Sequence, residues 1–122
     1  MFTADQIVAH LVGDYLTQSH WMATCKTKRW LPAAIHAAIY TATFVLLTRS
    51  VAALLVIGGS HYLIDRYRLA RFVVWAKNGC RGHVTATGYP DDVPAWLSVW
   101  LLIIADNTMH ILINGAALRW LA

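Results

Sequence analysis

The chain has 122 residues, of which 58% are apolar and only 13% are charged, and its mean hydropathy is +0.50. Charged residues alone make up about 25% of an ordinary soluble domain, so this composition argues against one. Ten Lys and Arg outnumber six Asp, which gives a net charge of +4. In so apolar a chain we attribute this excess to membrane topology and expect no nucleic-acid partner.

Four apolar segments follow in chain order, at about residues 4–23, 31–48, 51–70 and 94–118. Each is close to the roughly 20 residues that an α-helix needs to cross the hydrocarbon core of a bilayer. The sequence therefore predicts an all-α fold, a four-helix transmembrane bundle that forms a single integral membrane domain over residues 1–122. The first segment is the least apolar, and a re-entrant or interfacial helix is the alternative there.

Basic residues indicate how this bundle is oriented. Eight of the ten lie between the first two segments or from the end of the third onward, namely Lys26, Lys28, Arg29, Arg66, Arg68, Arg71, Lys77 and Arg81. Four crossings place both groups on one side of the membrane, and Lys and Arg accumulate on the cytoplasmic side. We therefore expect a multi-pass protein of the inner (cytoplasmic) membrane, with both termini outside and a cytoplasmic loop between the third and fourth helices.

Three of the segments carry a histidine and an aspartate four residues apart. The pairs are His10 with Asp14, His61 with Asp65 and, in reverse order, Asp106 with His110. Residues at i and i+4 share one helix face, with Cβ atoms about 5–6 Å apart. The fourth segment runs antiparallel to the first and third, so all three histidines are expected on the outer side of their aspartates. His36, in the second segment, is expected near the aspartate layer or below it.

Three aspartates in apolar helices need a compensating positive charge. Each costs about 2.5–3.5 kcal/mol at the centre of a membrane helix, and no Lys or Arg falls at mid-depth in any predicted span. We therefore predict one or two divalent metal ions, with zinc first and manganese or iron as alternatives. Protonated aspartates or His⁺–Asp pairs are the other explanation. The predicted ligands are His10, Asp14, His36, His61, Asp65, Asp106 and His110.

Further polar residues are candidates for catalysis and for substrate binding. A carboxylate that is not a ligand, Asp14 or Asp65, would serve as the general base. Gln18 continues the stripe of His10 and Asp14 by another four residues and is the third catalytic candidate. The basic residues Lys26, Arg66, Arg68 and Arg71 are expected to meet an anionic substrate at the mouth of the site. The alternative is that these basic residues serve topology and lipid head groups.

The whole set of polar residues resembles a family of small bacterial and phage membrane proteins known only as a domain of unknown function. The resemblance rests on His10, Asp14 and Gln18, on Trp21 and Lys26 after them, on His36, on Ser60-His61 with Asp65, and on Asp106 with His110. It covers nearly the whole chain. In that family a glutamine usually follows the last aspartate, where this chain has Asn107. More loosely, the repeated His/Asp pairs are similar to families of membrane-bound metal-dependent hydrolases, which implies hydrolysis.

Three functions remain open from the sequence. The first is a metal-dependent hydrolase that acts on a phosphoester or lipid-linked substrate at the membrane. The second is proton or metal-ion transport through the His/Asp ladder. The third is a binding or regulatory protein without catalysis, in which the metal only stabilises a small bundle. The lipid bilayer is the expected partner in every case, and assembly into a homo-oligomer is left open.

Overall fold

The structure is a computed structural model that describes residues 2–122. Within this range the chain is helical and contains no β-strand, which confirms the predicted all-α fold. The elements are α1 (Ala4–Leu11), the π-helical segment η1 (Val12–Leu16), α2 (His20–Cys25), α3 (Trp30–Phe44), α4 (Val51–Tyr67), α5 (Ala70–Lys77) and α6 (Ala95–Trp120).

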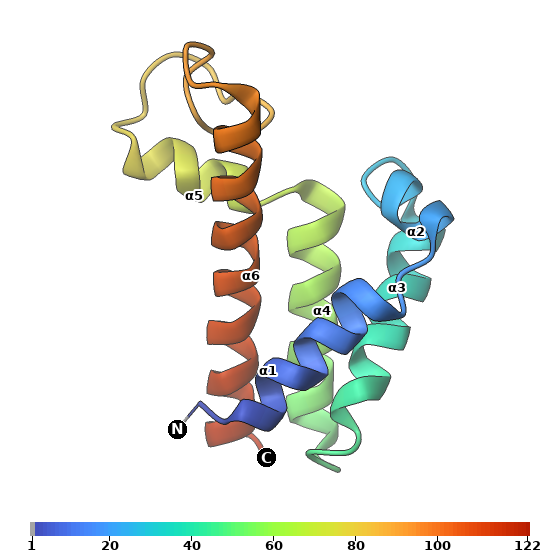
Figure 1. The fold of residues 1–122 in the computed structure, drawn as a ribbon. Coiled ribbons are helices and arrows are strands. Elements are labelled where there is room, and N and C mark those ends of the chain that lie inside the picture. Colours follow the sequence, from blue (N-terminus) through green and yellow to red (C-terminus); the bar gives the residue numbers. More distant parts are fainter. Residues whose placement is uncertain (1) are drawn as a thin grey trace.

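Helix α4 lies at the centre of the arrangement, because it packs against α3 on one side and α6 on the other (Figure 1). Helix α1 crosses the bundle and contacts both α3 and α6. The two chain ends lie at one end of the molecule, whereas α2 and α5 lie towards the other (Figure 1). Four elements, η1, α3, α4 and α6, thus converge on the interior between these two ends.

The predicted bundle of four membrane spans is not supported. Within residues 2–122 one helix, α6, is long and apolar enough to cross a membrane. Helices α3 and α4 have 15 and 17 residues, which corresponds to about 22–26 Å at 1.5 Å per residue, short of the roughly 30 Å hydrocarbon core. The multi-pass topology with both termini outside depended on four spans and is equally unsupported.

The first and third predicted segments are shorter as helices because polar residues interrupt them. The segment at 4–23 divides into α1, η1 and α2, and Ser19 begins α2 as an N-cap that accepts a hydrogen bond from the Met22 amide at 3.3 Å. The segment at 51–70 ends at Arg68, which adopts the left-handed conformation (φ 52°, ψ 49°) and closes α4. A continuous apolar run in the sequence therefore does not guarantee a continuous helix.

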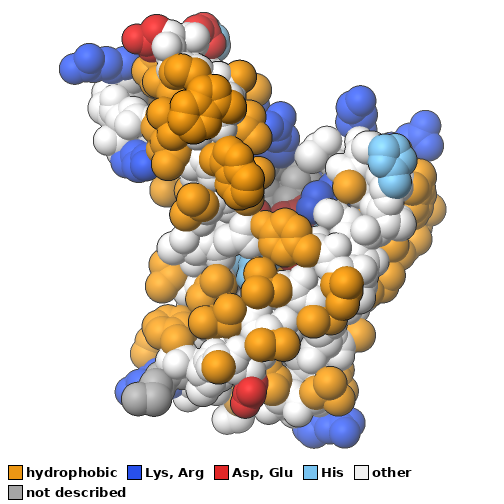
Figure 2. Space-filling model, in the orientation of Figure 1, with side chains coloured by type: hydrophobic (Ala, Val, Ile, Leu, Met, Phe, Trp, Pro, Cys, Tyr) orange, Lys and Arg blue, Asp and Glu red, His pale blue; other side chains and the backbone are white. Residues whose placement is uncertain are grey.

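Polar and apolar side chains are distributed in an unusual way. The buried apolar cluster is small and consists of Ala9, Tyr40, Phe44, Ile57 and Ala117. By contrast, the fully buried side chains include Gln6, three histidines besides His10, and Asn114. Large apolar side chains cover the outside of the molecule (Figure 2), and only 11% of the residues in the most apolar stretch of α6 are buried. The fold therefore encloses polar groups and exposes apolar ones.

Two glycines permit the close helix contacts that frame the interior. A Cβ atom at Gly13 of η1 would lie 2.8 Å from Tyr40 Cδ2 and 3.2 Å from the Tyr40 Cα of α3. A Cβ at Gly58 of α4 would lie 2.3 Å from Thr41 Oγ1 of α3. At these separations any side chain would push the elements apart, so the glycines keep η1 and α4 against α3.

Candidate metal centre

A buried cluster of histidines and aspartates lies where η1, α3, α4 and α6 converge. Two overlapping groups of side chains could each hold a metal ion, because their ligand atoms lie within 4.8 Å of one another. The first group is Asp14, His36, His61 and Asp65, all buried. The second is Asp14, Asp106 and His110. Asp14 belongs to both, so the two groups form one continuous centre.

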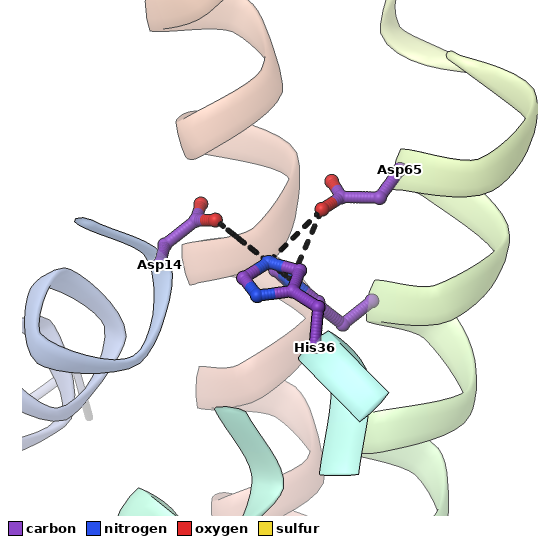
Figure 3. Close-up of side chains that lie close together, drawn as sticks. Asp14, His36 and Asp65 are labelled. Atoms are coloured by element: carbon purple, nitrogen blue, oxygen red, sulfur yellow. Dashed lines mark hydrogen bonds and ion pairs between the residues drawn. The ribbon is translucent and has the colours of Figure 1, made fainter. Parts of the chain in front are cut away.

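The first group is built around His36 of α3, whose ring lies between a carboxylate from η1 and one from α4 (Figure 3). His36 Nε2 lies 3.3 Å from Asp14 Oδ1 and 3.3 Å from Asp65 Oδ2. His61 Nε2 lies 3.2 Å from Asp65 Oδ2, 3.8 Å from Asp14 Oδ1 and 3.0 Å from His36 Nε2. His36 therefore lies near the aspartates, as the sequence predicted.

These five distances fit a tetrahedral ligand set. Zinc bonds of about 2.0–2.2 Å to nitrogen and oxygen place the ligand atoms of a tetrahedron about 3.3–3.5 Å apart. Five of the six separations among the four ligand atoms are 3.0–3.8 Å, and the sixth, between Asp14 and Asp65, is within 4.8 Å. Two imidazoles and two carboxylates are also a donor set that suits zinc, manganese or iron. The side chains present therefore fit a divalent transition metal.

The second group extends the centre towards α6. His110 Nε2 lies 3.3 Å from Asp106 Oδ2, four residues away on the same helix, and 3.3 Å from Asp65 Oδ1. His110 Nδ1 also approaches His61 Nδ1 at 3.3 Å. The side chain of Asp106 is 27% exposed, whereas that of Asp65 is 5% exposed. The centre is thus closed on the histidine side and open beside Asp106.

His10 lies outside both groups, unlike the other six predicted ligands. Its Nδ1 is 2.8 Å from the Tyr40 hydroxyl and its Nε2 is 2.6 Å from Asn107 Oδ1. The π-helical turn is the physical reason, since the Thr17 amide bonds to the Val12 carbonyl five residues back. The wider turn shifts Asp14 away from the face that carries His10. Asp14 meets His36 instead.

The sequence places no Lys or Arg at mid-depth and Lys26 only at the mouth of the site, but the Lys26 ammonium reaches the aspartates. Lys26, at the end of α2, places Nζ 2.6 Å from Asp65 Oδ2 and 3.9 Å from Asp14 Oδ1, with a side chain only 16% exposed. The long aliphatic stem lets an ammonium enter from outside the helix that carries the carboxylates. A residue expected only at the mouth of the site therefore supplies positive charge inside the cluster.

A cavity of about 240 Å³ opens over the carboxylates, and residues of η1, α4, α5 and α6 line it. Figure 2 shows this hollow with acidic and basic side chains at its floor. Gln18, a predicted catalytic residue, and Lys26 and Arg68, two predicted substrate contacts, line this cavity. Arg66 does not, because its guanidinium donates to the Thr27 carbonyl at 2.6 Å and fixes the turn that carries Lys26.

Two further residues, Arg71 and Tyr15, line the cavity, and of these Tyr15 was not predicted from the sequence. Arg71 of α5 lines the cavity, and its Nε is buried without a hydrogen-bond partner among residues 2–122. Tyr15 lines it too, and its hydroxyl accepts a hydrogen bond from Asn107 Nδ2 at 2.5 Å. Arg71 was expected, with Arg66 and Arg68, either to meet an anionic substrate or to serve topology, whereas Tyr15 is an aromatic beside Asp14 with no motif of its own.

The fold and the cluster define an all-α protein with a buried His/Asp centre that could hold a metal ion. The chain belongs to the family described as "Protein of unknown function (DUF3307)", whose model matches residues 2–113. The match covers every member of both ligand groups. No curated protein and no solved structure matches the chain.

Proposed function

We propose that this protein is a membrane-embedded, metal-dependent hydrolase of a phosphoester or lipid-linked substrate. The observation that carries the proposal is the convergence of two ligand groups, sharing Asp14, on the floor of a cavity with basic walls. Asp14, His36, His61 and Asp65 would hold one cation, and Asp106 with His110 would hold a second beside it. A bound divalent cation would polarise the substrate oxygen and lower the pKa of a water molecule towards 7.

The side chains around the cavity have separate roles in this proposal. Asp106 is the carboxylate most open to the cavity, so it can accept a proton from water whenever it is not a ligand. Gln18 can orient that water, because its Oε1 has no hydrogen-bond partner among residues 2–122. Arg68 and Arg71 favour an anionic substrate by charge. Leu102 and Ile103 offer an apolar wall for a lipid chain.

The membrane location is supported by the exposed surface. Large apolar side chains that face outward include Leu46, Leu55, Trp100 and Ile104, with exposed fractions of 88%, 70%, 62% and 57%. Soluble monomers rarely expose apolar patches beyond a few hundred Å². A lipid environment suits such a surface, together with an interior that satisfies its own polar groups.

A hydrolysis assay on detergent-purified protein tests the proposed reaction. The protein is loaded with Zn²⁺ or Mn²⁺ and offered bis(p-nitrophenyl) phosphate and a short-chain phosphatidic acid. We expect release of nitrophenol or phosphate that a chelator abolishes and that His61→Gln loses. Full metal loading without turnover of either ester, in a folded protein, would contradict the hydrolase proposal.

A second function, proton conduction, is favoured by one observation. Hydrogen bonds join His10, Tyr40 and Asn114 into a chain beside the centre, where the Tyr40 ring stacks on His61 with 3.6 Å between ring centroids. Tyr40 accepts from Asn114 Nδ2 at 2.6 Å and lies 2.8 Å from His10 Nδ1. In liposomes a conducting protein would collapse a pH gradient, and Tyr40→Phe would slow that collapse. A wild-type protein that leaves the gradient intact excludes this function.

A further inference from the structure

The cavity over the centre has balanced charges. Its lining contains three carboxylates and three basic side chains, namely Asp14, Asp65, Asp106, Lys26, Arg68 and Arg71. Their formal charges cancel, so an anion gains little long-range attraction from the cavity as a whole. One divalent cation among the carboxylates would give the cavity a net charge of plus two. Anion binding in this cavity is therefore coupled to metal binding by charge alone.

Lys26 and a metal ion would compete for the same oxygen atom. Lys26 Nζ lies 2.6 Å from Asp65 Oδ2, and that oxygen also lies 3.2 Å from His61 Nε2 and 3.3 Å from His36 Nε2. A cation held by this oxygen and the two imidazoles would lie beside the ammonium. Two positive charges at that range in a partly buried site repel strongly. Metal binding would therefore displace the ammonium from Asp65.

The Lys26 ammonium, once displaced from Asp65, can move into the cavity beside Arg68 and Arg71. The turn that carries Lys26 is fixed, because Arg66 Nη1 donates to the Thr27 carbonyl at 2.6 Å, so the side chain moves and the backbone stays. Lys26 lines the same cavity as Arg68 and Arg71. Arg71 Nε is buried there without a hydrogen-bond partner in residues 2–122. A buried donor without an acceptor is costly unless a ligand supplies one.

Arg68 supports this assignment through its backbone. It is one of two non-glycine residues with positive φ among those described, and it closes α4 at the edge of the cavity. A left-handed conformation costs a non-glycine residue roughly 1–2 kcal/mol. Arg68 Nη2 donates to the Ala86 carbonyl at 2.9 Å, which leaves the other guanidinium donors for a ligand. Strain of this kind concentrates at binding sites.

We propose that the cavity is a phosphate-binding site that a divalent metal switches on. The metal takes Asp65 from Lys26, and the released ammonium joins Arg68 and Arg71 around the phosphate group. This inference rests on the proposed metal site and adds to it the regulation of substrate binding. It makes Lys26 an inhibitor of metal binding and, once metal is bound, a ligand of the anion.

Metal affinity tests the competition directly. We would titrate Zn²⁺ into detergent-purified wild type, Lys26→Met and the control Lys28→Met, and measure binding by calorimetry. Lys28 lies two residues further along the chain, is exposed, and carries the same charge without the ion pair to Asp65 that Lys26 makes. Loss of the competing charge should tighten zinc binding by about tenfold or more in Lys26→Met, and Lys28→Met should match the wild type. If Lys26→Met fails to fold, Lys26→Arg and Lys26→Gln take its place. Lys26→Arg keeps the charge and should bind zinc about as tightly as the wild type, whereas the uncharged Lys26→Gln should bind it more tightly.

Phosphate binding tests the switch. Equilibrium dialysis with labelled inorganic phosphate should give binding to the zinc-loaded wild type at least about tenfold tighter than to chelator-treated protein. Lys26→Met with zinc should bind phosphate more weakly than zinc-loaded wild type. Tighter competition by dihexanoyl phosphatidic acid than by free phosphate would assign the site to a lipid head group. The opposite order would assign it to a soluble phosphate, and both orders support the site.

The failures are distinguishable. If neither wild type nor Lys26→Met binds zinc, the proposed metal site and this inference are both wrong. If both bind zinc with equal affinity, the metal site stands and the competition is wrong. If Lys26→Met binds zinc more tightly but phosphate binding is the same with and without metal, the switch is wrong.

Discussion

His36 and His61 share their contacts. Their Nε2 atoms lie 3.0 Å apart, and both face the carboxylates of Asp14 and Asp65. If both imidazoles are neutral, only one of the two Nε2 atoms can donate across this 3.0 Å gap. The other Nε2 then carries no proton and faces the carboxylate oxygens as a second acceptor. A shared cation satisfies all four groups at once. Lys26 supplies one such charge to Asp65, but it leaves the two nitrogens facing each other.

A pair of matched substitutions separates ligands from supporting residues. His61→Gln should weaken zinc binding by more than the roughly 10–100-fold that follows from disturbing an outer partner. His10→Gln should weaken it by no more than about tenfold, because both His10 nitrogens are bonded to Tyr40 and Asn107. Calorimetric titration with Zn²⁺ measures both. An equal loss of zinc affinity in the two variants would indicate that His10 is a metal ligand.

At the scale of elements, the sequence predicted which residues meet but not all the helices that bring them together. His61 with Asp65 and Asp106 with His110 are in contact at four-residue spacing, as regular α-helices require. His10 and Asp14 are not paired, because η1 is π-helical, and nothing in the residues Val12–Leu16 distinguishes a π-turn from an α-turn. The breaks that separate η1 from α2 and α4 from α5 escaped prediction, because apolar composition continues through the polar residues Ser19 and Arg68.

Glycines in two helices give a test of how closely η1 must approach α3. A Cβ at Gly13 would press on the ring and backbone of Tyr40, whereas a Cβ at Gly59 would meet nothing within 4 Å. Gly13→Ala should therefore lower the thermal stability and weaken zinc binding by moving Asp14. Gly59→Ala should stabilise the protein by about 0.5–1 kcal/mol, because alanine favours a helix. Thermal unfolding monitored by circular dichroism measures both, and a neutral Gly13→Ala would refute the close contact.

At the scale of the whole molecule, the polar interior and apolar exterior are the properties that composition predicted best. The count of membrane spans was predicted least well, because it depends on where helices end rather than on hydropathy. A helix can end without any drop in the apolar content of the sequence. This happens at Arg68, where α4 ends and the chain turns into α5. Only α6 has the length and composition of a span within residues 2–122.

A charge placed on the outside of α6 tests whether that face contacts lipid. Ile104 is 57% exposed near the middle of the helix. In water, an exposed Ile104→Arg would change stability by no more than about 0.5 kcal/mol, whereas at a bilayer centre it costs about 2.5–3.5 kcal/mol. We expect Ile104→Arg to reduce the carbonate-resistant membrane fraction, and Ala86→Arg, in the exposed loop, to leave it unchanged. Equal fractions for both variants would count against lipid contact.

The central claim, a metal centre joined through Asp14, is tested most directly by metal content. The measurement is inductively coupled plasma mass spectrometry on detergent-purified wild type and Asp14→Asn, each incubated with Zn²⁺, Mn²⁺ and Fe²⁺ and then desalted, with Asp5→Asn as the exposed control. Because Asp14 belongs to both ligand groups, we predict at least one metal ion per chain in the wild type and the control, and loss of all bound metal in Asp14→Asn. A folded wild type without bound metal, or equal metal in all three proteins, would contradict the account.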